Sequence, residues 1–219
     1  MSLIESAKFS ERMKGAVSIC WEMFSRKVGS GLILVNKEAS MQLQYAYLLK
    51  QIIPLITIHK NESFEVELET GVKIGDGTRE IDLMFRGSSG SEKYSIAIEM
   101  KCYKTLASSG KPRGATDIFM KDVYLDFYLL EQYINENHAN EAIALVMNDM
   151  KRLVHPVKKD AKCWDYDTSH GTKFSAKEFD TPIGGKPVNF FLESSYELNW
   201  SKHGDFWFMA AQGVESNMV

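Results

Sequence analysis

The sequence predicts an α/β fold with a mixed central β-sheet flanked by helices. Three features indicate it: neighbouring segments in which apolar and polar residues alternate, a later segment that is apolar throughout, and amphipathic helical patterns before and between them. Alternation is typical of a strand with one buried face, whereas a short continuous apolar run is typical of a strand buried on both faces. A sheet that contains both kinds of strand needs helices to cover it.

Two helices are expected before the first strand. Residues 9–24 have amphipathic spacing, and a turn follows at Gly29 to Gly31. Asn36 is suited to cap a second, longer helix, which should run until Pro54 disturbs it. The apolar stripe of this second helix consists of Met41, Tyr45, Leu48, Leu49 and Ile52.

Three strands are expected next, joined as an antiparallel meander. Residues 64–69 alternate Phe, Val and Leu with three Glu residues, so the acidic face should meet solvent. Glycine-rich segments predict turns at Gly71 to Gly77 and at Gly87 to Ser91. Residues 81–86 and 95–101 then form two strands that each have one apolar face.

The pairing of the last two strands brings two acids together. If they pair antiparallel about the Gly87 turn, Asp82 falls opposite Glu99. Directly opposed like charges weaken a sheet unless something neutralises them, and a divalent cation is the simplest candidate. The same register pairs Phe85 with Ile96, Leu83 with Ile98, and Ile81 with Met100.

The second half of the chain predicts a long helix and a buried strand. Residues 115–137 carry apolar residues at helical spacing and should cover the sheet. The apolar run at residues 141–148 predicts an interior strand. Beyond it we expect irregular chain at 151–185, strands at 187–198 and 205–209, and a frayed tail after residue 212.

Composition bounds the class of protein. A chain of 219 residues with 44% hydrophobic residues is most simply a single domain, residues 1–219. The net charge of -3 argues against a uniformly basic protein that coats nucleic acid, but it leaves a local basic groove open. The longest apolar segments are too short to span a bilayer, which predicts no membrane partner.

Cysteine and histidine usage bears on compartment and on metal chemistry. The three cysteines are widely separated and lack ligand spacing, so they predict free thiols in a reducing compartment. The five histidines likewise form no ligand spacing, which argues against a zinc site. We therefore expect a cytoplasmic protein.

The order of elements, with an Asp on one strand and Glu-x-Lys on the next, resembles the PD-(D/E)XK nucleases, the restriction-endonuclease-like superfamily. The resemblance covers residues 36–148 and rests on Asp82, the triplet Glu99-Met100-Lys101, and the acid Glu38. It implies a three-layer core at about 36–149, with residues 150–219 as a C-terminal elaboration. Ile81 stands where the family usually has Pro, at a position that varies in the superfamily.

The resemblance implies a role for each of these residues. Asp82, Glu99 and the backbone carbonyl of Met100 would hold Mg²⁺, for which Mn²⁺ can substitute, and Lys101 would orient or help deprotonate the attacking water. Such a site suits phosphodiester hydrolysis, which needs an activated water and neutralised phosphate charge. The alternative without a functional role is that Lys101 is a surface lysine beside two solvated acids.

An acid on the helix that precedes the sheet often approaches the metal or its water shell in this family. Glu38 matches that role, and Gln42, one turn later, is a weaker candidate. The alternative for Glu38 is that an acid in the first turn of a helix is favoured by the macrodipole alone.

A basic segment follows the triplet. Between Lys101 and Lys121 there is a single acid, Asp117, which also has i,i+4 spacing to Lys121. Phosphate-binding side chains would be useful there, although a solvated loop would have the same composition. The candidate nucleic-acid contacts are Lys121 and Arg113, followed by Lys111 and Lys104.

The sequence thus predicts a metal-dependent nuclease whose substrate is nucleic acid, most simply DNA. One alternative is a catalytically silent nucleic-acid-binding protein on the same fold, and another is a protein-interaction module. A homodimer would let two sites cut both strands of a duplex.

Overall fold

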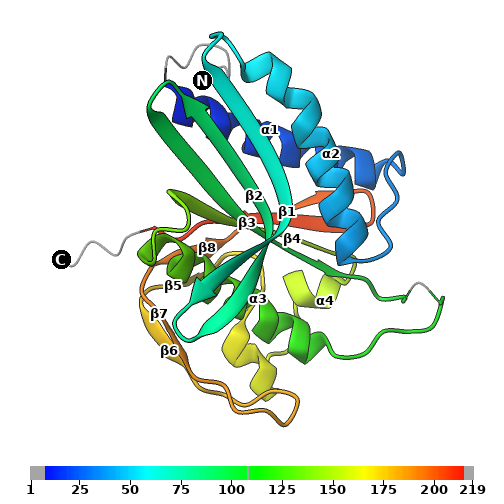
Figure 1. Cartoon of the computed structure of the whole chain (residues 1–219). Helices are drawn as coiled ribbons and strands as arrows, with labels where there is room; N and C mark the ends of the chain where they lie inside the picture. Colours follow the sequence, from blue (N-terminus) through cyan, green and yellow to red (C-terminus); the bar gives the residue numbers. More distant parts are fainter. Residues whose placement is uncertain (1–7, 108, 215–219) are drawn as a thin grey trace.

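A mixed six-stranded sheet lies at the centre of the computed structural model, which describes residues 8–107 and 109–214 (Figure 1). Among the described strands, β3 and β4 are the one parallel pair of this sheet, and its other neighbours are antiparallel. The α/β class and the mixed sheet are therefore confirmed. In spatial order the strands are β1 (Glu62–Ile74), β2 (Gly77–Ser89), β3 (Glu92–Tyr103), β4 (Glu141–Asn148), β10 (Phe206–Ala211) and β9 (Trp200–His203).

Helices cover both faces of the sheet. On one face lie α1 (Phe9–Gly29) and α2 (Glu38–Ile56), and on the other lies α3 (Thr116–Asn135). Successive residues of a strand point to opposite faces. Leu83 and Ile98 accordingly pack with α1 and α2, whereas Met84 and Ala97 pack with α3. The sheet therefore separates two hydrophobic cores, one beneath each layer of helices, and strands such as β2 and β3 contribute buried residues to both.

The register of the hairpin formed by β2 and β3 agrees with the prediction for Phe85 with Ile96 and Leu83 with Ile98. The predicted pairs Asp82–Glu99 and Ile81–Met100 lie beyond the end of this ladder. β4 has the predicted bounds and lies between β3 and β10, which confirms it as an interior strand. The long helix is also confirmed, two residues shorter at its C-terminal end than expected.

The first predicted turn, Gly71 to Gly77, is shorter than expected. β1 continues through Gly71 to Ile74, and the chain reverses at Gly75, whose φ of 54° suits glycine. An isolated glycine does not end a strand when apolar alternation resumes after it. Here Val72 and Ile74 pack against the core beside α3.

The bounds of α2 also differ from the prediction. Lys37, rather than Asn36, precedes the first helical residue, and the Ser40 hydroxyl accepts the N–H groups of both, at 2.9 Å from Asn36 and 3.1 Å from Lys37. A side chain inside the first turn thus supplies the cap. The helix also passes through Pro54 to Ile56, because a proline this near the C-terminal end removes few helical hydrogen bonds.

The C-terminal part departs most from expectation. The strand predicted at 187–198 is two strands, β7 (Phe190–Leu192) and β8 (Tyr196–Leu198), which belong to different two-stranded sheets. Their partners are β6 (Lys177–Phe179) and β5 (Thr172–Phe174). The segment predicted as irregular contains these two strands, the helix α4 (Lys151–Val154) and a 3-10 turn at Lys162–Tyr166.

The C-terminal segment also completes the central sheet. β10 and β9 lie beyond the predicted core of residues 36–149, yet they extend the sheet past β4. β9 was not predicted, because four residues carry too little pattern to be recognised. Val214 pairs with Ser195, so the tail is ordered to that point, and residues 215–219 lie outside the described ranges.

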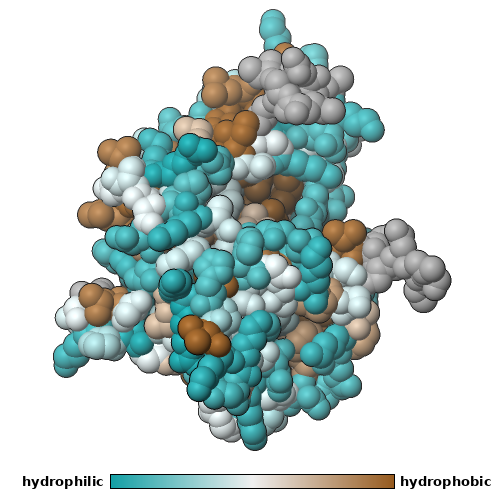
Figure 2. All heavy atoms as spheres, turned by 180° about the vertical axis from the view of Figure 1, so that it is seen from behind, coloured by the Kyte–Doolittle hydropathy of each residue, from teal (hydrophilic) through white to brown (hydrophobic). Residues whose placement is uncertain are grey.

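The surface is mostly polar on the side turned away from the view in Figure 1. Figure 2 shows that hydrophilic residues predominate there and that hydrophobic residues form several separate groups. None of the helices in the described ranges combines the length and the apolar composition needed to cross a bilayer. The cysteines Cys20, Cys102 and Cys163 are free, as the sequence predicts.

Candidate active site

The site begins at a bend in the hairpin formed by β1 and β2. Glu69 has a φ of 54°, which is unusual for a residue with a side chain, and it stands between the regular pairs Leu68–Leu83 and Thr70–Ile81. Asp82 is the β2 residue at this level. Figure 1 shows the two long strands twisting across the sheet here.

The bend sets the environment of Asp82. The paired ladder of β2 and β3 ends at Leu83 and Ile98, and beyond it the Met100 N–H donates to Asp82 Oδ2 at 2.7 Å. A carboxylate therefore takes the place of a backbone acceptor. Because N–H and C=O of one strand residue point to the same neighbouring strand, the Met100 carbonyl also faces the side of Asp82.

Glu99 lies next to Asp82 and is 5% exposed. Tyr133 of α3 donates its hydroxyl to Glu99 Oε1 at 2.8 Å. Burial raises the pKa of Glu99 well above its ordinary value, and the neighbouring carboxylates Asp126 and Asp82 raise it further. Burial also raises the pKa of Asp82, partly offset by the Met100 N–H. Two acids in this setting favour a cation between them.

Lys101, two residues along β3, supplies one positive charge. Its Nζ is 3.3 Å from Asp126 Oδ2 and 3.5 Å from Glu38 Oε1. Burial alone would lower the pKa of Lys101, but the surrounding carboxylates outweigh it and raise the pKa above its usual value. The side chain is therefore an ammonium ion at neutral pH.

Asp126 was not predicted as a site residue. It is 6% exposed on α3, and burial raises its pKa to about 7 despite the opposing effect of Lys101. Within the described residues its Oδ2 accepts no hydrogen bond, although the ion pair with Lys101 is present. A signal exists in the sequence, because Asp126 interrupts the apolar stripe between Val123 and Leu130.

Tyr133 was missed as well. It lies seven residues after Asp126, so the two side chains share one face of α3, which is the face turned to β3. A tyrosine in an apolar stripe has no distinctive pattern, since it packs as well as phenylalanine does. Its role follows only from the position of Glu99.

Glu38 reaches the site from the start of α2. The Cys102 N–H donates to Glu38 Oε2 at 3.3 Å, in addition to the ion pair with Lys101. Burial raises the pKa of Glu38 most, and Lys101 opposes this rise. Gln42, one turn later, is 7% exposed. Glu38 thus contacts the lysine, beyond any interaction with the helix dipole.

The donor atoms at Asp82 and Glu99 fit a hard cation. Mg²⁺ prefers oxygen ligands and is usually held by one or two carboxylates while it keeps several waters. Across residues 8–107 and 109–214, no three His, Cys, Asp or Glu side chains form a ready cage for a metal. Two carboxylates, with the Met100 carbonyl on the same side, would therefore hold Mg²⁺ or Mn²⁺ through few protein ligands.

The predicted phosphate contacts divide into two groups. Lys104 donates to the Val35 carbonyl at 2.9 Å, and Lys121 pairs with Asp122 at 2.6 Å instead of with Asp117. These two cations already have partners within the protein.

Arg113 and Lys111 are exposed on a long loop, which Figure 1 shows projecting from the fold. Leu106 and Pro112 pair across this loop, and Arg113 also lies over the ring of Tyr103, 5.8 Å from its centroid. The loop is held at its base, where Thr105 donates to Asp149 through its N–H and its hydroxyl. Arg113 and Lys111 are therefore the two predicted contacts that remain available to a ligand.

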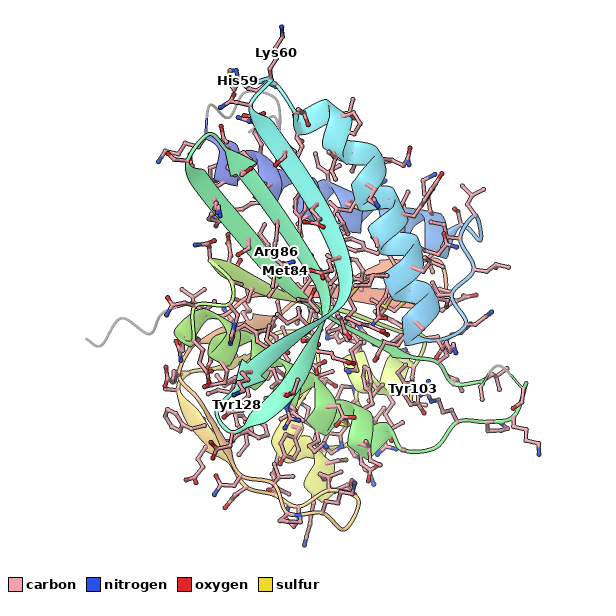
Figure 3. The ribbon with its side chains drawn as sticks, in the orientation of Figure 1. His59, Lys60, Met84, Arg86, Tyr103 and Tyr128 are labelled. Atoms are coloured by element: carbon pink, nitrogen blue, oxygen red, sulfur yellow. The ribbon has the colours of Figure 1, made fainter. Side chains whose placement is uncertain are left out.

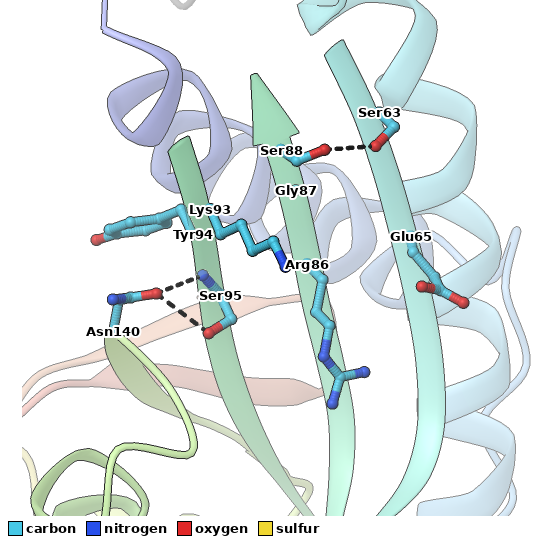
Figure 4. A pocket seen from close by; sticks show the side chains of 9 residues that line it. All are labelled: Ser63, Glu65, Arg86, Gly87, Ser88, Lys93, Tyr94, Ser95 and Asn140. Atoms are coloured by element: carbon cyan, nitrogen blue, oxygen red, sulfur yellow. Dashed lines mark hydrogen bonds between the residues drawn. The ribbon is translucent and has the colours of Figure 1, made fainter. Parts of the chain in front are cut away.

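A polar hollow of about 420 Å³ lies on the sheet face of Asp82, toward the other end of the strands (Figure 4). Several of its polar groups have partners within the chain: Ser63 and Ser88 share a hydrogen bond at 2.8 Å, and Asn140 Oδ1 accepts the Ser95 N–H at 2.9 Å. Arg86 pairs with Glu67. The buried Met84, labelled with Arg86 in Figure 3, lies between Asp82 and Arg86 along β2 and separates the hollow from the site.

The arrangement therefore brings together Asp82, Glu99, Lys101 and Glu38, all predicted, with Asp126, which was not; we call these five residues the acidic–lysine cluster. No protein-family model, curated protein or solved structure matches this chain, which leaves its own residues as the basis for a functional proposal.

Proposed function

We propose that this protein is a Mg²⁺-dependent nuclease that hydrolyses phosphodiester bonds in DNA, on a restriction-endonuclease-like three-layer fold. The observation that carries the proposal is the pair of neighbouring carboxylates, half-buried Asp82 and buried Glu99, beside the ammonium of Lys101 at the hairpin bend. Burying like charges together is costly, so such a pair is favoured where it binds a cation.

The chain's own residues have distinct tasks in this proposal. A bound Mg²⁺ would supply Lewis-acid stabilisation of the phosphate and a lowered pKa for a coordinated water. Asp82 and Glu99 would hold it, and Tyr133 keeps the Glu99 carboxylate oriented through its hydroxyl. Lys101 lies close enough to place its positive charge against a phosphate oxygen or the attacking water.

The raised pKa of Lys101 favours one of the two roles that the sequence left open. An ammonium flanked by Asp126 and Glu38 orients water and neutralises charge, whereas removing a proton from water requires a neutral amine. Glu38 and Asp126 are then positioning residues that hold Lys101 from α2 and from α3.

The test is cleavage of linear, circular and single-stranded DNA and RNA with Mg²⁺, Mn²⁺ or chelator. Replacing Asp82→Asn or Lys101→Ala should lower the rate by about 10²-fold or more, because each removes a group that acts on the developing charge. Matched controls are Glu92→Gln and Lys93→Gln, whose exposed side chains lie at the start of β3, away from the cluster.

Cleavage that needs metal, falls in both site variants and persists in both controls would support the nuclease. Unchanged cleavage in Asp82→Asn and Lys101→Ala would contradict the assignment. Binding without cleavage by any folded form would favour the catalytically silent nucleic-acid-binding protein. The same panel separates DNA from RNA as substrate, and light scattering with and without DNA tests the predicted homodimer.

A further inference from the structure

Two adjoining hollows near α4 form a concentrated basic surface. One has a volume of about 460 Å³ and the other about 310 Å³, and both are lined by Lys151 and His155. The remaining charged side chains of their lining comprise three more cations and a single acid, Asp160. We call the four cations Lys151, Arg152, Lys158 and Lys202 the α4 basic surface.

The charge of this surface is not compensated within the protein. In the described part of the chain, Lys151, Arg152 and Lys158 form no ion pair with a carboxylate, whereas the neighbouring Lys159 pairs with Asp167 at 2.6 Å. Lys202 lies over the ring of Trp207, 5.0 Å from its centroid. Because the whole chain carries a net charge of -3, this surface stands out against an acidic background.

The floor of the smaller hollow is aromatic. Trp200 and Trp207 line it and are only 7% and 8% exposed. Trp200 is held in place, because its indole N–H donates to the Thr168 carbonyl at 2.7 Å and its backbone N–H donates to His170 Nδ1 at 3.0 Å. A rigid apolar floor with a cationic rim suits a sugar–phosphate chain with its bases.

The sheet register places this surface on the same face as the acidic–lysine cluster. Lys101 pairs with Val146, Val146 with Met209, and Met209 with Trp200, so these residues form one row across β3, β4, β10 and β9. Since neighbouring strands are about 4.8 Å apart, Trp200 lies roughly 14 Å from Lys101. The Thr105–Asp149 contacts fix the chain between them.

We propose that the α4 basic surface binds the sugar–phosphate backbone of the substrate strand, several nucleotides away from the phosphodiester bond that lies at Asp82 and Glu99. Nucleotides of a strand in duplex DNA are about 3.4 Å apart, so a span of this size corresponds to roughly four nucleotides. This inference rests on the proposed function, because it assigns the surface to the same substrate. It adds contacts outside the basic segment at Lys104 to Lys121.

The test measures binding in chelator, where no cleavage occurs. Fluorescence anisotropy with single-stranded and duplex DNA of about 4 to 16 nucleotides, over a salt series, compares wild type with Lys151→Gln and Lys202→Gln. Glutamine keeps much of the side-chain stem and removes the charge. The control is Lys60→Gln, an exposed lysine that Figure 3 places at the far tip of the fold from Tyr103.

Each site variant should weaken binding severalfold and reduce the slope of log affinity against log salt by about one, whereas Lys60→Gln should change neither. Strands longer than about four nucleotides, which can contact the α4 basic surface and the site together, should bind wild type more tightly than shorter strands, which can contact only one of them. Equal affinity and slope for wild type and for both Lys151→Gln and Lys202→Gln would overturn the inference, as would failure of wild type to bind DNA.

The inference and the nuclease proposal can fail separately. Metal-dependent cleavage lost in Asp82→Asn, together with unaltered binding by Lys151→Gln and Lys202→Gln, would leave the nuclease and remove the surface. Charge-dependent binding at the surface by a protein that cuts nothing would keep the surface and remove the nuclease.

Discussion

At the scale of single residues, Lys101 is the centre of the site. Its Nζ lies between Glu38 of α2 and Asp126 of α3, so helices from opposite faces of the sheet fix one side chain. Asp126 is buried and Lys101 is half-buried, which strengthens this ion pair, whereas Glu38 is more exposed. A change in either acid should therefore alter the position of the Lys101 ammonium without changing the proposed metal ligands, Asp82 and Glu99.

Asp126→Asn should lower the cleavage rate by about 10- to 100-fold, the usual effect of losing a residue that orients an active-site group. The fold should tolerate it, because asparagine has the same shape and removes a buried carboxylate. Measurement of the rate and of the melting temperature checks both points. Asp122→Asn, one turn earlier on α3, is the matched control. Full activity in Asp126→Asn would show that Lys101 needs no support from α3.

At the scale of elements, a buried ion pair joins α1 to the start of β1. Arg12 pairs with Glu62, and both side chains are 1% exposed. Arg12 Nε also donates to the Ile56 carbonyl at 3.0 Å, and Glu62 Oε2 accepts the N–H of Ile58 at 2.9 Å. The pair thus fixes the end of α2 as well, and hence the frame that presents Glu38 to the sheet.

Arg12→Met should reduce the free energy of unfolding by about 3–5 kcal/mol, because it leaves Glu62 buried without its partner. Urea unfolding at neutral pH measures this loss. Arg26→Met is the control, since Arg26 is exposed and pairs with Glu22 on the surface, where such a pair contributes at most about 1 kcal/mol. Similar losses of unfolding free energy in Arg12→Met and Arg26→Met would show that the buried pair contributes no more than a surface pair.

This pair should also make stability depend on pH. Burial would raise the pKa of Glu62, but hydrogen bonds from Ile58, Arg12 and His59 lower it below its ordinary value of 4.5. The folded state then binds fewer protons than the unfolded state, so the stabilisation is present above that value and is lost as pH falls through the folded pKa. Urea unfolding of wild type and of Glu62→Gln, at neutral and at acidic pH, measures this effect. If the two proteins differ in free energy of unfolding by the same amount at both pH values, the predicted pH dependence is wrong.

At the scale of the whole molecule, the cluster costs stability when no cation is bound. Burial raises the pKa of Asp82, Glu99 and Asp126, which means that their charged forms are unfavourable in the fold. A ligand that binds only the folded state adds about 2.7 kcal/mol at a concentration 100 times its Kd. Divalent metal should therefore stabilise the protein even without substrate.

Mg²⁺ or Mn²⁺ should raise the melting temperature of wild type and leave that of Asp82→Asn nearly unchanged. In chelator, Asp82→Asn should be at least as stable as wild type, because it removes one of two adjacent acids. Differential scanning calorimetry with Mg²⁺, with chelator and with sodium at matched ionic strength tests this. A metal effect of equal size in both proteins would place the metal elsewhere.

Local pattern was enough to predict much of the sheet. Strict alternation in β2 and β3 fixed which faces are apolar, and a shift of one residue would have turned every apolar side chain to the wrong side. The register that brings Asp82 and Glu99 together could therefore be predicted. The same reasoning failed at Gly71, because a glycine in a long strand and a glycine in a turn look alike in sequence.

The sequence by itself determined the α/β class, the hairpin register, the interior strand β4 and the helix that covers it, because hydrophobic periodicity reports directly on burial. Only the tertiary structure decided that Asp126 and Tyr133 reach β3, that Glu69 bends the hairpin at Asp82, and that β9 and β10 bring Lys202 and Trp207 onto the face of Lys101. These contacts join residues far apart in the chain, and no local pattern encodes the packing that brings them together.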